Sequence, residues 1–411
     1  MTYCSALEFL LERFDQSVPR NTLAPLPFEI LHCEFSSRNA HVLPGASRYE
    51  CVPHGAVFGP ETVPHGDPGE SSHESLHVPD CGIGSNTGFR YPLFTRAGGG
   101  KAGSVIILIN GLNEKRWDKY LPWALRLAES TGKAVALFPI AFHMNRTPPD
   151  WSNARIMNAV SAERRQRYPS IAHSSFANAA ISVRLQAAPQ RFFWSGFQTY
   201  LDVVQLVEEI RGGRHGAVDP GASIDFFAYS IGSFLSELIL MTDPGGYFSN
   251  SRLFIFCGGP TLDRMYPGSR YIMDSEAVIA LHAYLIEHLD NEMRRYPRLC
   301  HYFVEHGELW DYFRAMLSYP KLKTVREDRF RGLAGRIEAL ALRQDGVIPP
   351  VEVINTLQGD ARDIPIRVHV KDFPYLYSHV MPFPFRHSLA PQLDECFDAV
   401  FDTAAAHLGK S

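Results

Sequence analysis

Six short apolar segments recur from Ser104 onward, and most of them are followed by a segment with helical spacing. The first, Val105-Ile-Ile-Leu-Ile109, is a continuous run of large apolar side chains, which is typical of a strand buried on both faces. Strands that alternate with helices form a mostly parallel sheet with helices on both faces, so we predict an α/β fold. The predicted strands are residues 105–109, 134–138, 223–228, 253–256, 337–342 and 366–370, and the predicted helices are about 118–130, 197–210, 231–241, 350–357 and 390–405.

The first hundred residues have a different composition from the rest. From about Pro19 to Gly100 the chain is rich in Pro, Gly, Ser and His, and helical patterns are few. Residues 28–35 and 88–95 are β-rich and are predicted to be edge strands joined by a long loop. We therefore expect residues 1–100 to form an irregular, β-rich extension that completes the antiparallel edge of the sheet or covers the mouth of the site. Residues 101–257 and 336–411 are expected to form the core.

Two long excursions, at about 143–193 and 258–335, interrupt the alternation. The clearest helix of the second excursion is predicted over 274–296, where Asp274 or Ser275 is the candidate N-cap and Pro297 lies beyond the end. Another helix is expected at about 299–317. Long insertions at strand ends usually carry function, so we expect residues 258–335 to form a helical cap that selects the substrate and excludes water.

The overall composition excludes several classes of protein. Lys and Arg number 40 against 44 Asp and Glu, so a basic, phosphate-neutralising patch for nucleic acid is not expected. No uninterrupted apolar stretch is long enough for a membrane span. The first residues do not have the pattern of a signal peptide, and the seven cysteines are dispersed, which favours reduced thiols in a cytoplasmic protein. The oligomeric state is not determined by the sequence.

The segment with the most chemical information is Asp225-Phe-Phe-Ala-Tyr-Ser230-Ile-Gly-Ser. An apolar strand runs directly into Ser230, and a helix begins at the next residue. Such a turn holds the serine hydroxyl at the carboxyl end of the strand, and it needs small residues such as Ala228 and Gly232 because the strand and the helix approach closely. The alternative is a buried serine that caps the helix and has only a structural role.

From these residues the chain resembles the α/β-hydrolase superfamily over about Ser104 to Leu408. The motif reads A-Y-S-I-G where G-x-S-x-G is commoner, and alanine also leaves room for the turn. In that superfamily the nucleophilic serine is followed along the chain by an acid and then a histidine. The resemblance therefore implies that two further residues follow Ser230 at the ends of later strands.

Asp345 and His379 meet this requirement. Asp345 follows the predicted strand at 337–342, and His379 follows the last one. A serine hydroxyl becomes a good nucleophile only when a base takes its proton, and the imidazole must be held in one tautomer by a carboxylate. Asp263 is an alternative acid, and His387 is an alternative base.

The resemblance also implies an oxyanion hole in the turn after the first buried strand. The amide of Leu112 would join that of Ile231 in donating to the developing oxyanion. Asn110 and Asn113 are candidates for an additional side-chain amide. The alternative is an ordinary Asn- and Gly-rich turn.

Four further residues are candidates for substrate binding. His143 and Arg146 follow a strand end, where ligands bind in open α/β sheets. Arg146 would hold a carboxylate or phosphate, although a solvated side chain or a pair with Asp150 is an equal alternative. Tyr229, beside the serine, and Tyr377, in the aromatic stretch before His379, are the other two candidates.

Metal and nucleotide sites are not predicted. The histidine-rich stretch, with His54, His65, His73, His77 and Cys81, lacks the ligand spacing of a closed zinc site. Gly98–Gly100 lacks the ending of a phosphate-binding loop, and no dinucleotide fingerprint follows a strand.

The sequence thus predicts an esterase-like serine hydrolase that acts on a small-molecule ester or thioester through an acyl-enzyme on Ser230 and that needs no cofactor or metal. One alternative is an acyltransferase or cyclase that uses the same acyl-enzyme. The other is a ligand-binding protein on the hydrolase fold that does no chemistry.

Overall fold

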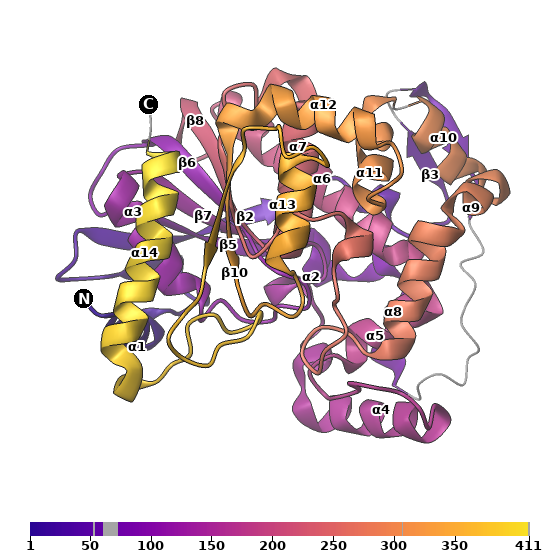
Figure 1. The fold of residues 1–411 in the computed structure, drawn as a ribbon, viewed down its shortest axis with the longest axis horizontal. Helices are drawn as coiled ribbons and strands as arrows, with labels where there is room; N and C mark the ends of the chain where they lie inside the picture. Colours follow the sequence, from indigo (N-terminus) through magenta and orange to yellow (C-terminus); the bar gives the residue numbers. More distant parts are fainter. Residues whose placement is uncertain (52–53, 61–72, 306, 410–411) are drawn as a thin grey trace.

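A nine-stranded sheet forms the centre of the molecule (Figure 1). The structure is a computed structural model that describes residues 1–51, 54–60, 73–305 and 307–409. The strands of the sheet lie in the order β1–β2–β5–β7–β6–β8–β9–β10–β11. Their bounds are β1 Arg20–Thr22, β2 Phe28–Ser36, β5 Gly88–Arg96, β6 Ala102–Ile109, β7 Ala134–Phe138, β8 Val218–Tyr229, β9 Leu253–Phe256, β10 Ile337–Leu342 and β11 Arg367–Lys371, while β3 Tyr49–Cys51 and β4 Ala56–Phe58 form a separate hairpin.

The six strands from β7 to β11 in the sheet order pair in parallel. Parallel neighbours need long crossover connections, and the helices that follow the strands supply them. The apolar runs of the sequence are buried on both faces; β6, β7, β9 and β10 have apolar side chains in alternation toward two separate cores. The predicted fold class, a mostly parallel α/β sheet with helices on both faces, is confirmed.

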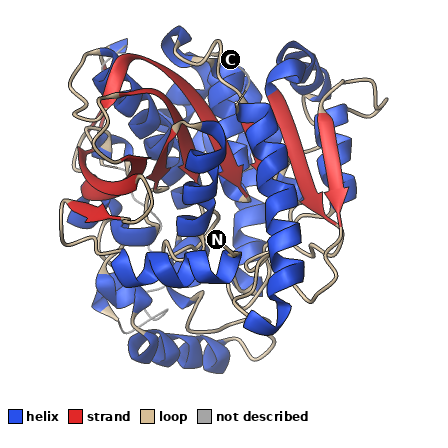
Figure 2. Cartoon of the chain, turned by 90° about the vertical axis from the view of Figure 1, so that its left-hand side faces the viewer, coloured by secondary structure: helices blue, strands red, loops and turns tan. Residues whose placement is uncertain are grey.

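Each face of the sheet is covered by its own group of helices. On one face lie α1 (Tyr3–Arg13), α3 (Tyr120–Thr131) and α14 (Ala390–Leu408), and Figure 2 looks onto this side. On the other face lie α6 (Gln190–Arg211), α7 (Ile231–Thr242) and α13 (Pro350–Gln358) (Figure 1). Because neighbouring residues of a strand point to opposite faces, Ile107 packs with the second group and Ile106 with the first.

The first hundred residues complete the sheet rather than forming a separate unit. The predicted strands at 28–35 and 88–95 are β2 and β5, which pair antiparallel, and β5 continues the sheet by pairing antiparallel with β7. The helix α1 was not predicted; it buries Tyr3, Leu7 and Leu10 against α3 and α14. The extension therefore forms the antiparallel edge of the sheet.

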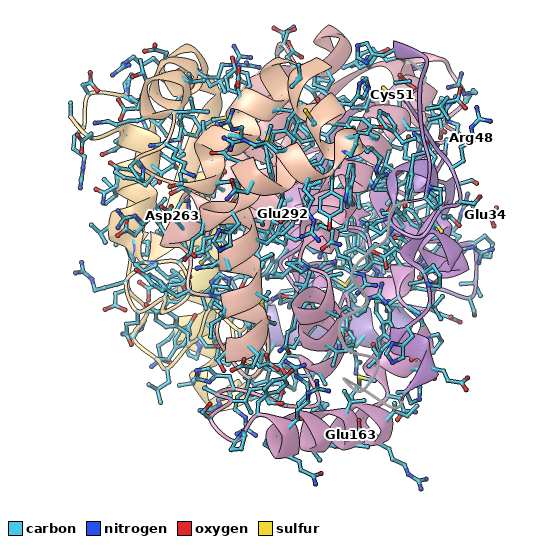
Figure 3. The ribbon with its side chains drawn as sticks, turned by 90° about the vertical axis from the view of Figure 1, so that its right-hand side faces the viewer. Glu34, Arg48, Cys51, Glu163, Asp263 and Glu292 are labelled. Atoms are coloured by element: carbon cyan, nitrogen blue, oxygen red, sulfur yellow. The ribbon has the colours of Figure 1, made fainter. Side chains whose placement is uncertain are left out.

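The two excursions are mainly helical, and Figure 3 views the side on which they lie. Among the described residues, none of the helices has both the length and the apolar character that a membrane crossing requires. The helices are α4 Ala154–Arg167 and α5 Ala179–Ala187 in the first excursion, and α8 Ser275–His282, α9 Leu289–Arg295, α10 Pro297–Glu305, α11 Glu308–Leu317 and α12 Lys323–Leu333 in the second, while a short α2 spans Gly84–Thr87.

The long helix predicted over 274–296 is broken. Its start is as expected, because the Asp274 side chain accepts a hydrogen bond from Ala277 N as an N-cap. A π-helical turn at Ala283–Glu287 then interrupts it, and α9 follows as a separate helix. Pro297 lies beyond the end of α9, as expected, and it also opens the next helix, since the first helical position needs no amide donor. The helix expected at 299–317 is also divided, at Gly307 with a φ of 52°.

Candidate active site

Ser230 occupies a sharp turn between β8 and α7. Its backbone has φ 56° and ψ −125°, a conformation that L-residues rarely adopt, and it directs the side chain away from the strand. Gly232 is required at this turn because a Cβ there would lie 2.6 Å from the carbonyl oxygen of Ile109. The strand, the turn and the helix thus have the local geometry expected of a nucleophile elbow.

His379 and Asp345 lie beside this serine at the carboxyl ends of neighbouring strands. Asp345 follows β10 and His379 follows β11. His379 Nδ1 donates to Asp345 Oδ2 over 2.7 Å, which leaves Nε2 as the acceptor of the Ser230 hydroxyl, also at 2.7 Å. All three residues are buried, so water competes little with these two hydrogen bonds.

The two alternative residues have other partners. Asp263 accepts hydrogen bonds from Thr261 Oγ1 and from the backbone amide of Tyr319, which ties its loop to the second excursion. His387 is exposed and pairs with Glu8 at 2.9 Å. Neither takes part in the hydrogen-bonded chain at Ser230.

Several contacts hold Asp345 and His379 in place. The second oxygen of Asp345, Oδ1, accepts hydrogen bonds from the backbone amides of Val347 and Ile348, at 2.9 Å each. These bonds fix the carboxylate so that Oδ2 faces the imidazole. The buried thiol of Cys257 lies near the same carboxylate, and its pKa is raised, first by burial and then by the negative charge of Asp345.

Tyr229 and Tyr377 hold the loop that carries His379 in position through contacts of their hydroxyl groups. The Tyr229 hydroxyl donates to the carbonyl of His379, and its ring stacks on the imidazole with centroids 5.5 Å apart. The Tyr377 hydroxyl accepts from the amide of Gln344 and donates to Asp372, so it links the aspartate loop to the histidine loop. The geometry therefore favours a supporting role for both tyrosines over the predicted contact with substrate.

The amides of Leu112 and Ile231 are the candidate oxyanion donors. Ile231 is the first residue of α7, where a helix leaves amide groups without an internal acceptor. Within the described part of the chain, neither amide donates a hydrogen bond to protein. Both residues line the same cavity, beside Ser230 in sequence or in space. Two unsatisfied donors next to a nucleophile are what a tetrahedral oxyanion requires.

Asn110 and Asn113 stabilise this turn instead of pointing their amides at the site. Asn110 is fully buried; it donates to Gly111 O and accepts from the amide of Ile140. Asn113, with a φ of 61°, donates through its side chain to the carbonyls of Ala177 and Tyr271. The two excursions therefore help to fix the position of the Leu112 amide.

His143 supports the same turn and lines the cavity, and its contact with substrate stays a prediction. Its Nδ1 donates to Ala141 O, and its Nε2 accepts from the amide of Asn113 at 2.8 Å. Burial lowers the pKa of His143 from 6.5 to about 4, with smaller contributions from nearby Arg146 and Lys115. The imidazole is therefore neutral at neutral pH, as the hydrogen bond from Asn113 requires.

The geometry does not support the prediction that Arg146 binds substrate. Its guanidinium is fully buried, pairs with Asp202 at 2.7 Å and donates to Asn86 and to Pro139 O. These contacts occupy the donors that an anionic substrate would need. Sequence reasoning could not find this pair, because Asp202 lies on a helix 56 residues away.

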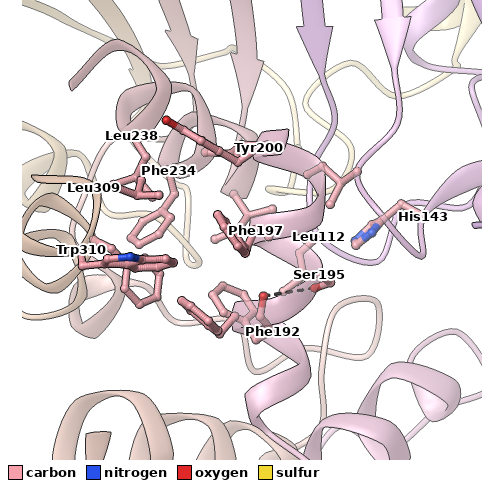
Figure 4. Close-up of a pocket in the computed structure, with 16 residues that line it drawn as sticks. Leu112, His143, Phe192, Ser195, Phe197, Tyr200, Phe234, Leu238, Leu309 and Trp310 are labelled. Atoms are coloured by element: carbon pink, nitrogen blue, oxygen red, sulfur yellow. Dashed lines mark hydrogen bonds between the residues drawn. The ribbon is translucent and has the colours of Figure 1, made fainter. Parts of the chain in front are cut away.

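The cavity walls were also missed by sequence reasoning. The cavity that Leu112 and Ile231 line is named the apolar pocket from here on and is shown in Figure 4. A signal was present in the aromatic run Phe192-Phe193-Trp194 and in the apolar stripe of α7, but neither pattern differs from that of an ordinary core helix. Its remaining lining residues are Ile140, His143, Phe192, Phe193, Ser195, Gly196, Phe197, Tyr200, Phe234, Leu235, Leu238, Leu309, Trp310 and Phe313.

One group of side chains in the described residues could hold a metal ion. It consists of Cys51, His54 and His301, whose candidate ligand atoms lie within 4.8 Å of one another. The group joins the β3–β4 hairpin to α10 and is separate from the loops that carry Ser230, Asp345 and His379. Of the other histidines considered in the sequence, His65 lies outside the described residues.

Comparisons with solved structures give distant likenesses. Carboxyl esterase 2 from the mycorrhizal fungus Tuber melanosporum is 12% identical, with 79% of this chain and 83% of that chain covered and a TM-score of 0.43. A thermostable esterase from Pseudomonas putida is 9% identical, with 79% and 81% covered and a TM-score of 0.43. A hyperthermophilic esterase from the archaeon Pyrobaculum calidifontis is 12% identical, with 79% and 82% covered and a TM-score of 0.39. These TM-scores are below 0.5, so the function proposed below rests on the site geometry.

Comparisons at the sequence level give a family. None of the curated proteins matches the chain. A family model matches residues 1–409, nearly the whole sequence, and its description is a family of unknown function. The chain therefore belongs to that family, DUF6051.

Proposed function

We propose that this protein is a serine hydrolase of the α/β-hydrolase superfamily that cleaves a carboxylic ester or thioester. The observation that carries the proposal is the continuous chain of two 2.7 Å hydrogen bonds from the Ser230 hydroxyl through His379 to Asp345. A structural serine at a helix start has no need of a buried histidine that is itself held by a carboxylate. The two amides without a protein acceptor beside it, those of Leu112 and Ile231, add the fourth requirement of acyl transfer.

The first half of the reaction forms an acyl-enzyme. His379 Nε2 takes the proton of the Ser230 hydroxyl as its oxygen attacks the substrate carbonyl. The negative charge that develops on the carbonyl oxygen is stabilised by the amides of Leu112 and Ile231. When the tetrahedral intermediate collapses, the C–O or C–S bond breaks, and the imidazolium returns the proton to the leaving group.

The second half releases the acid. Water enters in place of the leaving group, His379 removes one of its protons, and the resulting oxygen attacks the acyl carbon. The second tetrahedral intermediate expels the Ser230 oxygen, which regains its proton from His379. Asp345 keeps the imidazole in the required tautomer and stabilises its cation in both halves, without itself becoming protonated.

Residues 258–335 contribute directly to this site in the proposal. Their helix α11 supplies Leu309, Trp310 and Phe313 to the apolar pocket. An apolar cover of this kind excludes water around the oxyanion and strengthens the hydrogen bonds that stabilise it. We therefore assign the second excursion the role of a cap.

Labelling with a short-chain fluorophosphonate tests the proposal. We expect one equivalent of probe to attach to Ser230, and hydrolysis of p-nitrophenyl esters to fall by at least about 10⁴-fold in Ser230→Ala. Ser236→Ala is the matched control: this serine is buried on α7, the helix that follows Ser230, and its hydroxyl donates to Gly232 O. The control is expected to be labelled like the unmodified protein. No labelling, or full ester turnover by Ser230→Ala, would rule the proposal out.

A further inference from the structure

We propose that the apolar pocket binds the acyl part of the substrate, and that this acyl part is an uncharged chain of about eight carbons. This inference rests on the proposed function, because it names the substrate class of the same site. Four features of the pocket support it: the helices that form its walls, the lack of charged groups in its lining, its position on the side of Ser230 away from His379, and its length.

Three helices form the walls. From α7 the pocket takes Ile231, Phe234, Leu235 and Leu238, which have the i, i+3, i+4, i+7 spacing of one helix face. Helix α6 supplies Phe193, Phe197 and their neighbours, and α11 supplies the third wall. Figure 4 shows Leu112 and His143 at one end and Leu238, Leu309 and Trp310 at the other.

The cap helix is packed firmly against the core helix. The ring of Trp310 lies 4.9 Å from that of Phe193 and 5.3 Å from that of Phe197, measured between centroids. Aromatic contacts at these distances stabilise the junction beyond the burial of their area. The far part of the pocket is therefore a formed wall that joins segments more than 100 residues apart in the sequence.

The polar groups of the lining do not call for a charged ligand. His143 is neutral and has two hydrogen bonds, the Ser195 hydroxyl donates to Phe192 O, and the Tyr200 hydroxyl bonds to Thr242. Among the side chains of the described lining, only Trp310 Nε1 is a buried polar atom without a hydrogen-bond partner, and an indole N–H is an uncharged donor. A carboxylate or ammonium placed here would lose its hydration without gaining a counter-charge, which is strongly unfavourable.

The position of His379 decides which part of the substrate enters this pocket. The imidazole must reach the leaving-group atom to protonate it, so the leaving group lies on the histidine side of Ser230. A second pocket lies on that side, because it is lined by Ser378 and Val380, the two neighbours of His379. The apolar pocket includes neither of these residues and begins at the two oxyanion amides. The acyl part, which stays on Ser230, therefore points into the apolar pocket.

The two pockets also differ in charge. The second pocket has Glu114, Lys115, Arg116, Asp118 and Lys119 in its lining, whereas the apolar pocket has no acidic or basic side chain other than neutral His143. The difference matches an ester with an apolar acyl part and a more polar leaving group.

The length of the pocket sets the size of the acyl part. Ile231 and Leu238 are seven residues apart on α7, so the wall between them extends about 10 Å at 1.5 Å per residue. An extended chain advances roughly 3.4 Å for every three single bonds, so about 10 Å corresponds to roughly nine bonds. Since the first of these bonds joins the Ser230 oxygen to the acyl carbon, a chain of about eight or nine carbons fills the pocket from the oxyanion end to Leu238.

The test is a series of p-nitrophenyl esters from acetate to palmitate, assayed below the critical micelle concentration of each. We expect kcat/KM to rise by up to about fourfold for each methylene group that becomes buried, to reach its maximum near octanoate and to fall beyond decanoate. Benzoate is included in the series because an aromatic acyl part would also suit apolar walls. A maximum at acetate, a flat profile, or a preference for benzoate over octanoate would overturn the inference.

Two variants show whether the profile comes from this pocket. Leu238→Trp fills the far end, and we expect the ratio of octanoate to acetate kcat/KM to fall at least tenfold. Leu309→Ala opens the same end and is expected to raise kcat/KM for decanoate and laurate relative to kcat/KM for octanoate. Ile279→Trp is the matched control, since Ile279 is exposed on α8 and lines none of these pockets. It is expected to keep the ratio of the unmodified protein.

The labelling of Ser230 separates this inference from the proposed function. If Ser230 is labelled and both variants leave the dependence of kcat/KM on acyl chain length unchanged, the assignment of the acyl part to this pocket is wrong while the serine hydrolase proposal stands. If Ser230 is not labelled, the proposed function itself fails. Loss of cooperative unfolding in one variant leaves the other to decide, because the two are expected to shift the profile in opposite directions.

Discussion

The loops that carry Ser230, Asp345 and His379 and the apolar pocket beside them are built in different ways. The loops are held by hydrogen bonds: the Asp345 carboxylate accepts from the amides of Val347 and Ile348 and from His379, and the His379 loop is supported by the Tyr229 hydroxyl. The pocket is held by the packing of three helices from distant parts of the chain. Leu112 is the meeting point of the two regions, since its amide belongs to the turn and its side chain to the pocket.

This difference separates rate from selectivity. A hydrogen-bonded loop fixes atoms to within a few tenths of an ångström, as proton transfer and oxyanion stabilisation require. A packed apolar wall discriminates by shape and by buried area, which changes by small steps with each methylene group. Substitutions in the loops should therefore lower kcat for every ester, and those in the pocket should change the order of preference among esters.

The largest expected effect comes from breaking the loop region alone. In Asp345→Asn the side chain keeps its size, but the imidazole loses the carboxylate that fixes its tautomer. We expect kcat to fall about 10⁴-fold, with the preference for octanoate over acetate retained. Steady-state kinetics on the same ester series would check this. A changed order of preference would contradict the separation of the two regions.

The next effect concerns His143, which lines the pocket and accepts a hydrogen bond from the turn that carries the Leu112 amide. Its pKa is about 4 in the folded protein against 6.5 ordinarily, so the unfolded chain binds the proton more readily between these values. The contribution of His143 to the free energy of unfolding is therefore present in full above pH 6.5 and is lost as the pH falls toward 4. Between pH 7 and 4.5 the loss is about 2–3 kcal/mol.

His143→Gln provides the comparison for that prediction. Glutamine retains a donor and an acceptor but does not titrate. Between pH 7 and 4.5, the free energy of unfolding of the variant should therefore fall by about 2–3 kcal/mol less than that of the unmodified protein. Urea unfolding at pH 7 and 4.5 for both proteins gives the two differences. Equal losses in the two proteins would show that the protonation of His143 is not coupled to folding.

The smallest effect involves Glu237, on the part of α7 that does not line the pocket. Its side chain is fully buried, and within the described residues neither carboxylate oxygen has a hydrogen-bond partner. Burial raises its pKa well above 4.5, so the folded protein keeps the proton while the unfolded chain loses it as the pH rises. The contribution of Glu237 to the free energy of unfolding is therefore present in full below pH 4.5 and is lost as the pH rises above that value.

Glu237→Met removes both the unsatisfied oxygens and the titration. We expect the free energy of unfolding at pH 7 to rise by about 1–2 kcal/mol, with a smaller gain at pH 4.5 and no change in the ester profile. Urea unfolding at the two pH values measures the gain. A destabilised variant, or a gain that decreases with rising pH, would contradict this account.

Much of the architecture could be predicted because its signals are local. The buried strands appear as apolar runs, and the strand–Ser230–helix turn is contained within a few residues. Asp345 and His379 could be chosen because they follow predicted strands of the parallel sheet, the buried β10 and the terminal strand β11, and the carboxyl ends of parallel strands lie at the same end of the sheet. The break in the helix predicted over 274–296 was not foreseen, since apolar spacing continues through the π-helical turn at Ala283–Glu287.

The sequence by itself predicted the parallel strands, the helices between them and a site of Ser230, Asp345 and His379, with Asp263 and His387 as alternatives, because each depends on periodicity or on the neighbours of one strand. Only the tertiary structure decided that Arg146 pairs with Asp202, that Tyr229 supports His379, and that Trp310 closes a pocket against Phe193. These are contacts between distant segments, and a side chain that will be buried beside a partner has the same local pattern as one that will meet solvent or substrate. Burial and partnership are properties of the folded chain, so they are settled only when its segments pack together.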